Sequence, residues 1–208
     1  MLNSVLCGNM LLTHFFVYLP AKKIGYEDSM ISKIKDFFLS KYLADNNIVR
    51  HPNLYSIEQA ESIGILCEIT DEASYKSIFR VFNRLQQEGH RVKMVGYVNA
   101  PEVPFYCLPQ LSADYFCNKH LNWYGYPKTV QIHDFMKHDF DMLLDFNFRC
   151  FPAVKVILSQ SKAKCIVGRD PGSQPLYDLF INAPGHDEMR FLDEVCTYTQ
   201  KLTGNEKQ

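Results

Sequence analysis

The sequence predicts an α/β fold, a three-layer sandwich built on a mostly parallel sheet. Short, nearly continuous apolar runs, typical of strands covered on both faces, alternate with segments in which apolar residues recur every three or four positions. Hydrophobic residues make up 47% of the 208 residues, which is enough for one sizeable core. We divide the chain into residues 1–29, a leader or upstream-start extension; residues 30–60, an N-terminal amphipathic helix and connector; and residues 61–204, the α/β domain.

The first part of the chain allows three interpretations. Residues 2–19 contain no charged residue, and a run of this length is near the lower limit for a membrane span. Polar residues interrupt the run, and no basic residue precedes it as a signal peptide requires. Translation that begins at Met30 is the first interpretation, and an ordered N-terminal segment is the second. The third is a membrane anchor, which would keep the domain in the cytoplasm because Lys22 and Lys23 follow the run.

Residues 30–45 are expected to form a helix, with Ser29 as its N-cap and Asn46 and Asn47 as its stop. Its apolar stripe consists of Ile31, Ile34, Phe38 and Tyr42. We expect this stripe to dock on the domain, and contact with a membrane surface is the alternative.

The α/β domain is expected to begin with a strand–helix–strand unit. Residues 63–69 form the first strand, Thr70 or Asp71 caps the helix, and Gly89 ends it before a second strand at residues 91–98. The crossover between two such parallel strands is expected to be right-handed.

Residues 104–127 contain seven aromatic residues. Aromatic faces beside lysines suit the stacking of bases or sugars. Because the formal net charge is −1, with 22 basic and 23 acidic residues, we expect no nucleic-acid partner. We therefore favour a long loop that folds its rings over the sheet.

The second half of the domain centres on residues 140–146, predicted to be a central strand buried on both faces. A helix at residues 151–162 and a strand at residues 163–167 follow it. Residues 176–182 are predicted to be the last strand, an antiparallel edge strand that follows a turn. A helix at residues 187–202 ends the fold. Together these elements predict a Rossmann-like sheet.

Cysteine and motif content assign no chemistry. The seven cysteines are scattered and lie mainly in apolar runs, which indicates reduced thiols in a cytoplasmic protein. Cys117 and His120 form the only tight pair of zinc-ligand type, whereas a structural site usually needs two such pairs. The chain has no Gly-x-Gly-x-x-Gly, P-loop or Gly-x-Ser-x-Gly motif. We therefore assign no catalytic residue and expect neither a metal nor a cofactor.

The candidate ligand-binding residues follow from their position. In parallel-rich α/β sheets, ligands bind beyond the carboxyl ends of the strands. The polar residues expected there are Thr70, Asp71, Glu72, Asn99, Asp145, Asn147 and Arg149. Carboxylates in this place suit binding of a cation, general-base catalysis or contacts with sugar hydroxyls. The structural alternative is that Asp71 and Glu72 cap a helix and that Asp145 bonds to neighbouring amides.

Arg169 is a further candidate, because it lies in the turn at residues 168–173. Its guanidinium and the amides of that turn are suited to an anion. An ordinary Asp-Pro-Gly turn is the interpretation that we favour.

Four segments resemble a domain-of-unknown-function family of small bacterial proteins: Asn-Trp-Tyr-Gly at 122–125, Phe-Asp-Met-Leu-Leu-Asp-Phe-Asn at 140–147, Ala-Lys-Cys-Ile-Val-Gly-Arg at 163–169 and Tyr-Asp-Leu-Phe-Ile at 177–181. The resemblance covers residues 30–202, and it implies no activity and no catalytic residues. More distantly, the order of strand, helix and strand from residue 140 to residue 168 resembles the first half of heptosyltransferase-type glycosyltransferases. The chain is too short for their second half, so that resemblance implies a fold rather than the activity.

Two hypotheses on function follow. We favour a non-catalytic interaction module, in which the aromatic segment or the N-terminal helix meets a partner protein. The alternative is a domain or minor enzyme that binds a nucleotide or sugar in the crevice at the strand ends. Contact with a membrane is expected only if residues 1–29 form an anchor.

Overall fold

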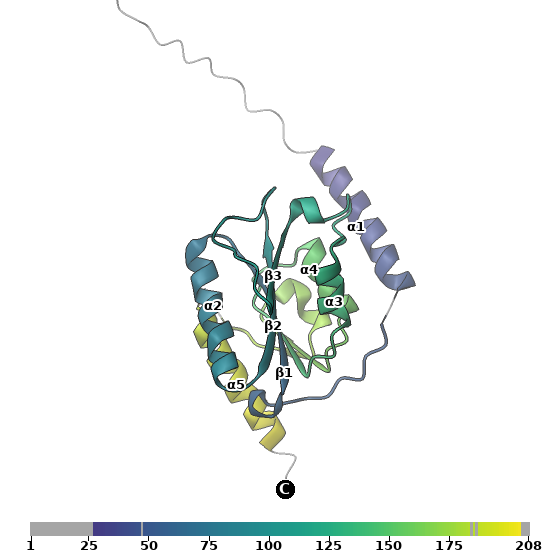
Figure 1. Cartoon of the computed structure of the whole chain (residues 1–208). Helices are drawn as coiled ribbons and strands as arrows, with labels where there is room; N and C mark the ends of the chain where they lie inside the picture. The colour runs from purple at the N-terminus through teal and green to yellow at the C-terminus, as the bar shows by residue number, and fades with distance from the viewer. Residues whose placement is uncertain (1–26, 47, 184, 186, 205–208) are drawn as a thin grey trace, which may run out of the picture.

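The computed structural model describes residues 27–204 except 47, 184 and 186, and it contains one six-stranded sheet (Figure 1). The strand order is β3-β2-β1-β4-β5-β6, and every neighbouring pair is parallel. The strands are β1 (Ser62–Glu68), β2 (Arg91–Val98), β3 (Ala113–Cys117), β4 (Met142–Asp145), β5 (Cys165–Gly168) and β6 (Leu179–Phe180). The predicted α/β class and parallel sheet are confirmed.

Helices cover both faces of the sheet (Figure 1). One face carries α2 (Glu72–Gln87) and α5 (Glu188–Gly204), and the other carries α3 (Val130–Lys137) and α4 (Pro152–Gln160), with α1 (Glu27–Asp45) packed against α4. The described residues also form three short 3₁₀ helices: η1 (Ile57–Gln59), η2 (Asn118–His120) and η3 (Pro171–Leu176).

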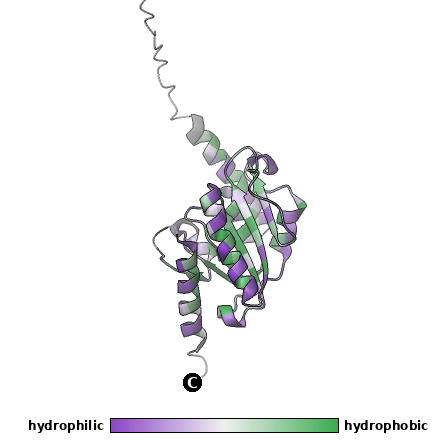
Figure 2. Cartoon of the chain, turned by 60° about the vertical axis from the view of Figure 1, so that its left-hand side comes forward, coloured by the Kyte–Doolittle hydropathy of each residue, from purple (hydrophilic) through white to green (hydrophobic). Residues whose placement is uncertain are grey.

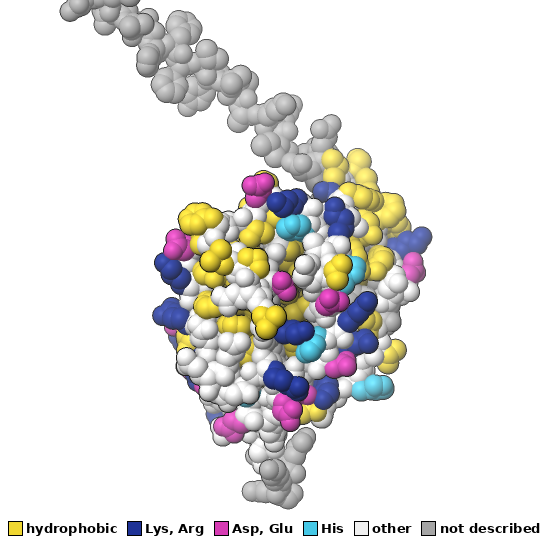
Figure 3. Space-filling model, in the orientation of Figure 1, with side chains coloured by type: hydrophobic (Ala, Val, Ile, Leu, Met, Phe, Trp, Pro, Cys, Tyr) yellow, Lys and Arg dark blue, Asp and Glu magenta, His cyan; other side chains and the backbone are white. Residues whose placement is uncertain are grey.

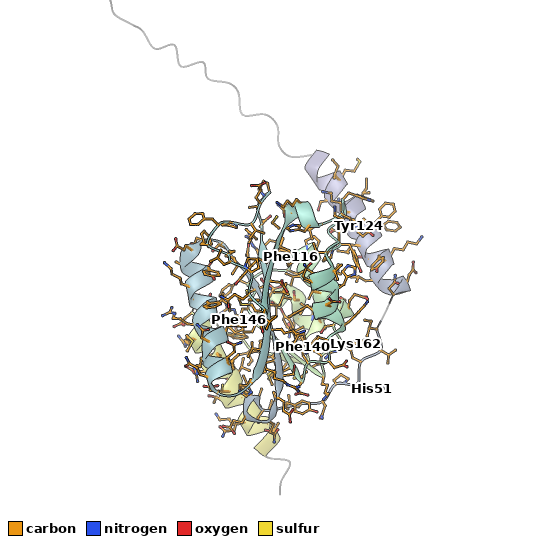
Figure 4. All side chains as sticks on the ribbon, in the orientation of Figure 1. His51, Phe116, Tyr124, Phe140, Phe146 and Lys162 are labelled. Atoms are coloured by element: carbon orange, nitrogen blue, oxygen red, sulfur yellow. The ribbon has the colours of Figure 1, made fainter. Side chains whose placement is uncertain are left out.

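The continuous apolar runs are explained by a core that lies on both sides of the sheet. In β1, Ile63 and Ile65 belong to the cluster on the α2–α5 side, whereas Leu66 belongs to the cluster on the α3–α4 side. Phe140 and Phe146, which flank β4, likewise lie on opposite sides of the sheet (Figure 4). Hydrophobic residues accordingly fill the strands, while the outer faces of α2 and α5 are largely hydrophilic (Figure 2). A strand exposed on one face would alternate instead.

The predicted central strand is confirmed, because β4 lies between β1 and β5. The predicted antiparallel edge strand is wrong, since β6 pairs with β5 in parallel. Asp170 does not begin a hairpin turn. It caps η3 by accepting hydrogen bonds from Gly172 N (3.1 Å) and Ser173 Oγ (2.7 Å), and η3 carries the chain back so that β6 runs in the same direction as β5.

Two other predictions need correction. Residues 104–127 are not one long loop, because they contain the edge strand β3. The helix α1 begins at Glu27, so Ser29 lies inside it, and Ile31, Ile34 and Phe38 of its predicted docking stripe are exposed. Leu39 makes the buried contact, and Tyr42 of the predicted stripe does pack on the domain, with its ring 4.8 Å from that of Tyr126. Periodicity shows that a helix has an apolar face, but it does not show which face meets the domain.

The three interpretations of residues 1–29 fall on a segment of which the structure describes only residues 27–29. Within the described part of the chain, no helix combines the length and the apolar character needed to cross a membrane.

Replacing Gly168 in β5 by alanine is expected to destabilise the protein. A Cβ at this position would overlap the ring of Tyr177, and such overpacking typically costs about 1–3 kcal/mol. Urea unfolding followed by circular dichroism measures the loss. Gly204→Ala is the control, because no atom lies within 4 Å of its Cβ position and alanine favours a helix. Equal midpoints for Gly168→Ala and wild type would contradict the packing described for Tyr177.

Candidate functional site at the carboxyl ends of the central strands

The strand order reverses between β1 and β4, which is the switch point of the sheet. The helix that follows β1, α2, packs on one face, whereas the helix that follows β4, α4, packs on the other. Because the two connections diverge, the carboxyl ends of β1 and β4 leave a crevice between them. Ligands of open α/β sheets bind at this position.

A cavity of about 330 Å³ occupies the crevice. Its lining combines the aromatic side chains of Phe146 and Phe148 with six polar residues, which are Glu68, Thr70, Ser74, Asn147, Arg149 and Glu188. A larger cavity of about 540 Å³, lined in part by Ser62, Arg91 and His138, lies at the amino ends of the strands. We centre the site on the smaller cavity, because parallel sheets bind their ligands at the carboxyl edge.

An ion pair borders the cavity. Arg149 Nη2 lies 2.8 Å from Glu68 Oε1, and its Nε lies 3.4 Å from Oε2. The guanidinium also lies 4.7 Å from the centroid of the Phe151 ring. Hydrogen bonding to Glu68 raises the pKa of Arg149. The pair therefore presents a planar carboxylate and a planar guanidinium side by side.

Arg169 lies behind the cavity, in the interior. Its Nε and Nη2 donate to the carbonyl of Phe146 at 3.1 and 2.8 Å, and its guanidinium stacks 3.6 Å from the centroid of Phe148. Burial lowers the pKa of Arg169 to about 10, although Glu188, 3.9 Å away, opposes the shift. The guanidinium thus hydrogen-bonds to the carbonyl of Phe146 and stacks on the ring of Phe148. The sequence had suggested instead that it holds an anion together with the amides of the turn at residues 168–173.

Asp145 and Asn147 form a buried network with Tyr177. Tyr177 Oη donates to Asp145 Oδ2 at 2.6 Å, while the backbone N–H of Asn147 (3.1 Å) and its side-chain Nδ2 donate to Oδ1. Burial raises the pKa of Asp145 to about 6, and these hydrogen bonds limit the rise. Asn147 lines the cavity, and its buried Oδ1 accepts no hydrogen bond from any described residue.

The first turn of α2 is closed by its own side chains. Ser74 N donates to Asp71 Oδ1 at 2.7 Å, and Ser74 Oγ accepts from the backbone N–H groups of Thr70 (3.0 Å) and Asp71 (3.1 Å). Glu72 pairs with Lys76 one turn later. Asp71 and Glu72 therefore cap the helix, which is the alternative to ligand binding that the sequence allowed. They also place negative charge where a Rossmann-type sheet holds phosphate.

The structure brings together some of the predicted residues and adds others. Thr70, Asn147 and Arg149 line the cavity, whereas Asn99 does not and instead accepts hydrogen bonds from Tyr97 Oη (3.4 Å) and Asn118 Nδ2 (3.3 Å). The prediction missed Glu68, Ser74, Phe146, Phe148 and Glu188. Glu68 is the last residue of β1, so its place at the carboxyl edge of the sheet could have been predicted from the sequence. Glu188 is the first residue of α5, and only the tertiary fold brings it to the cavity.

Cys117 and His120 do not converge with the two histidines that follow them in the chain, His133 and His138. Cys117 Sγ lies 3.6 Å from His120 Nδ1, but His133 is bonded to Pro127 O and His138 lies beside Ser62 Oγ. Over residues 27–204, apart from the three masked positions, no group of three or more His, Cys, Asp or Glu side chains is placed to hold a metal ion.

The raised pKa of Asp145 predicts a pH dependence of stability with a defined sign. The folded state holds the proton up to about pH 6 and the unfolded state only up to about pH 4, so the stability contributed by Asp145 is lost as pH rises between these values. Asp145→Asn cannot ionise. The unfolding free energy of the wild type, relative to this variant, should therefore fall by about 2–3 kcal/mol between pH 4 and pH 7.

Urea titrations at several pH values measure this difference, and Asp141→Asn is a control of opposite sign. Burial raises the pKa of Asp141, but hydrogen bonds from Lys164 and Ser62 outweigh it and leave that pKa lowered. The wild type should lose stability relative to Asp141→Asn as pH falls. A pH-independent difference for Asp145→Asn would be incompatible with a raised pKa.

Comparison with known proteins identifies a family but no activity. Nothing among the curated proteins matches the chain, and no solved structure matches it. The model of a family of unknown function, DUF6913, matches residues 33–202, which include every described strand and the whole lining of the cavity. The chain is therefore a member of the DUF6913 family.

Proposed function

We propose that the chain is a small-molecule-binding domain whose cavity, at the carboxyl ends of β1 and β4, accepts a hydroxyl-rich molecule of monosaccharide size. The strand order is that of Rossmann-type sheets, in which ligands occupy this position. The volume of about 330 Å³ is at the lower end of the usual range for small-molecule sites.

The unpartnered oxygen of Asn147 carries the proposal. Asn147 is 1% exposed, and its Nδ2 donates to Asp145, which fixes the amide with Oδ1 directed elsewhere. A buried acceptor without a donor costs about 1–3 kcal/mol. A ligand hydroxyl that reaches this oxygen from the cavity would supply the missing donor.

The remaining lining suits the same class of ligand. The paired side chains of Glu68 and Arg149 offer acceptors and donors in one plane, which matches two adjacent hydroxyl groups. Glu188 contributes a second carboxylate whose side chain is 12% exposed, and Ser77 Oγ donates to it at 2.5 Å. The rings of Phe146 and Phe148 provide apolar walls for the carbon skeleton.

The first turn of α2 distinguishes a sugar from a nucleotide. Rossmann-type nucleotide sites hold phosphate on the free N–H groups of this turn. Here the N–H groups of Asp71 and Ser74 already donate to the side chains of Ser74 and Asp71, respectively. Asp71 and Glu72 also add negative charge. A phosphate group would meet repulsion at this position, so we favour an uncharged, hydroxyl-bearing ligand.

Thermal-shift measurements with pentoses, hexoses, N-acetylated amino sugars and inositols, each beside its phosphorylated form, test the proposal. A ligand at about ten times its Kd contributes roughly 1.4 kcal/mol, which raises the Tm of a chain of this size by about 3–6 °C. We expect stabilisation by an unphosphorylated compound and less by its phosphate. No shift with any compound at 10 mM, or shifts with phosphates alone, would reject the proposal.

Two matched variants locate the binding site. Glu188→Gln removes a carboxylate from the cavity, and the loss of a charged hydrogen bond should weaken the Kd about 10-fold or more. Glu72→Gln makes the same chemical change outside the lining, where Glu72 pairs with Lys76, and should leave the Kd within about twofold. Titration calorimetry with the compound that gives the largest shift compares them. Equal effects of the two substitutions would place the binding elsewhere.

A further inference from the structure

An apolar surface lies outside the cavity, along the N-terminal half of α1 (Figure 3). It consists of six large side chains that are each more than two-fifths exposed: Met30, Ile31, Ile34, Phe37, Phe38 and Trp123. Phe37 is 65% exposed and Trp123 is 56% exposed. We call these six residues the α1 surface.

The five α1 residues form one stripe, because positions 30, 31, 34, 37 and 38 are separated by three and four residues or are direct neighbours. The helix meets the domain with a different face, through buried Leu39 and partly buried Leu43. Both faces of α1 are thus apolar, and the domain covers only one of them.

The surface has a defined shape because its aromatic members contact one another. The Phe38 ring lies 5.0 Å from Trp123, centroid to centroid, in an edge-to-face arrangement, and 5.7 Å from Phe37. Trp123 comes from the segment that follows η2, so it ties the stripe to the body of the domain. The stripe is therefore presented on a supported helix.

The size of the α1 surface matches one side of a protein–protein interface. An aromatic side chain alone can bury about 150–250 Å², so six large side chains together offer several hundred Å². The largest exposed apolar patch of a monomer is often a functional surface. A typical interface buries about 800 Å² on each partner, which the stripe and its polar rim can supply.

The charges of α1 favour a protein partner over a lipid surface. Helices that bind anionic membranes carry an excess of lysine and arginine. The charged residues of α1 whose side chains the structure describes are instead nearly balanced, with three lysines and two acids: Lys33, Lys35, Lys41, Asp36 and Asp45.

We propose that the α1 surface binds a second copy of this chain, with the two α1 helices antiparallel and the two-fold axis at Ile34. In this arrangement, Ile34 meets its own counterpart, Met30 meets Phe38, and Ile31 meets Phe37. Every large member of the stripe then has an apolar partner, which a two-fold interface requires of a single patch. Trp123, beside Phe38, covers the end of each contact.

Analytical ultracentrifugation of the full chain is the first test. The wild type is expected to be a dimer at micromolar concentration, and Ile34→Glu should raise the dissociation constant by at least about 30-fold because it places two like charges at the axis. Leu111→Glu is the control, since it makes a similar change at a fully exposed leucine outside the α1 surface. It should leave the dimer intact.

Cysteine cross-linking tests the antiparallel register. In a Cys150→Ser background, which removes an exposed native thiol, Ile34→Cys should form an intermolecular disulfide on mild oxidation. Ser40→Cys, which is exposed on α1 but lies off the stripe, should cross-link much less. Non-reducing electrophoresis gives the yield of each.

Three outcomes would overturn the proposal: a full chain that is monomeric at 100 μM, a dimer that survives Ile34→Glu, or equal cross-linking by the two cysteine variants. Cosedimentation with vesicles of mixed anionic and neutral phospholipid, lost in Ile34→Glu while the protein stays monomeric, would assign the surface to a membrane instead.

Discussion

The buried guanidinium of Arg169 is the interaction on which the carboxyl edge of the sheet depends. It leaves the end of β5, donates twice to the carbonyl of Phe146, and lies against the rings of Phe148 and Phe191. An unpaired buried cation costs several kcal/mol, and here the carbonyl, the rings and Glu188 offset part of that cost, while Nη1 is buried with no hydrogen-bond partner among the described residues. Because Arg169 follows β5 and its partners come from the β4–α4 connection and α5, one side chain links three segments.

Much of the fold was predictable because short, nearly continuous apolar runs are typical of strands that are buried on both faces. Residues 63–69 and 140–146 are continuous apolar runs between helical segments, and both became neighbouring central strands. The edges were not predictable. Strand β3 carries half-buried residues among aromatic loops, and β6 has only two residues, so neither shows a periodic signal. Asp170-Pro171-Gly172 fits a hairpin turn and the start of a 3₁₀ helix equally well.

The candidate site was predictable as a place but not as a set of contacts. Parallel strands put Thr70, Asn147 and Arg149 at the same edge, and the structure finds all three around one cavity. Asp145 belongs to the same strand end, yet its carboxylate is turned inward toward Tyr177, because a strand covered on both faces buries its side chains in either direction. Which way a side chain turns and where α5 begins relative to β1 depend on packing between distant segments.

The order of the strands also has a consequence for how the chain folds. The unit β1-α2-β2 and the unit β4-α4-β5 are each continuous in sequence, whereas the seam between them joins residues as distant as Ser62 and Asp141, 79 positions apart. Closing so long a loop costs entropy before any contact repays it, so each half can form before the seam does. Pairing across the seam therefore carries a larger loop-closure cost than pairing within either half. Since the crevice lies at the carboxyl end of the seam, a molecule bound there would contact both halves and stabilise the folded state.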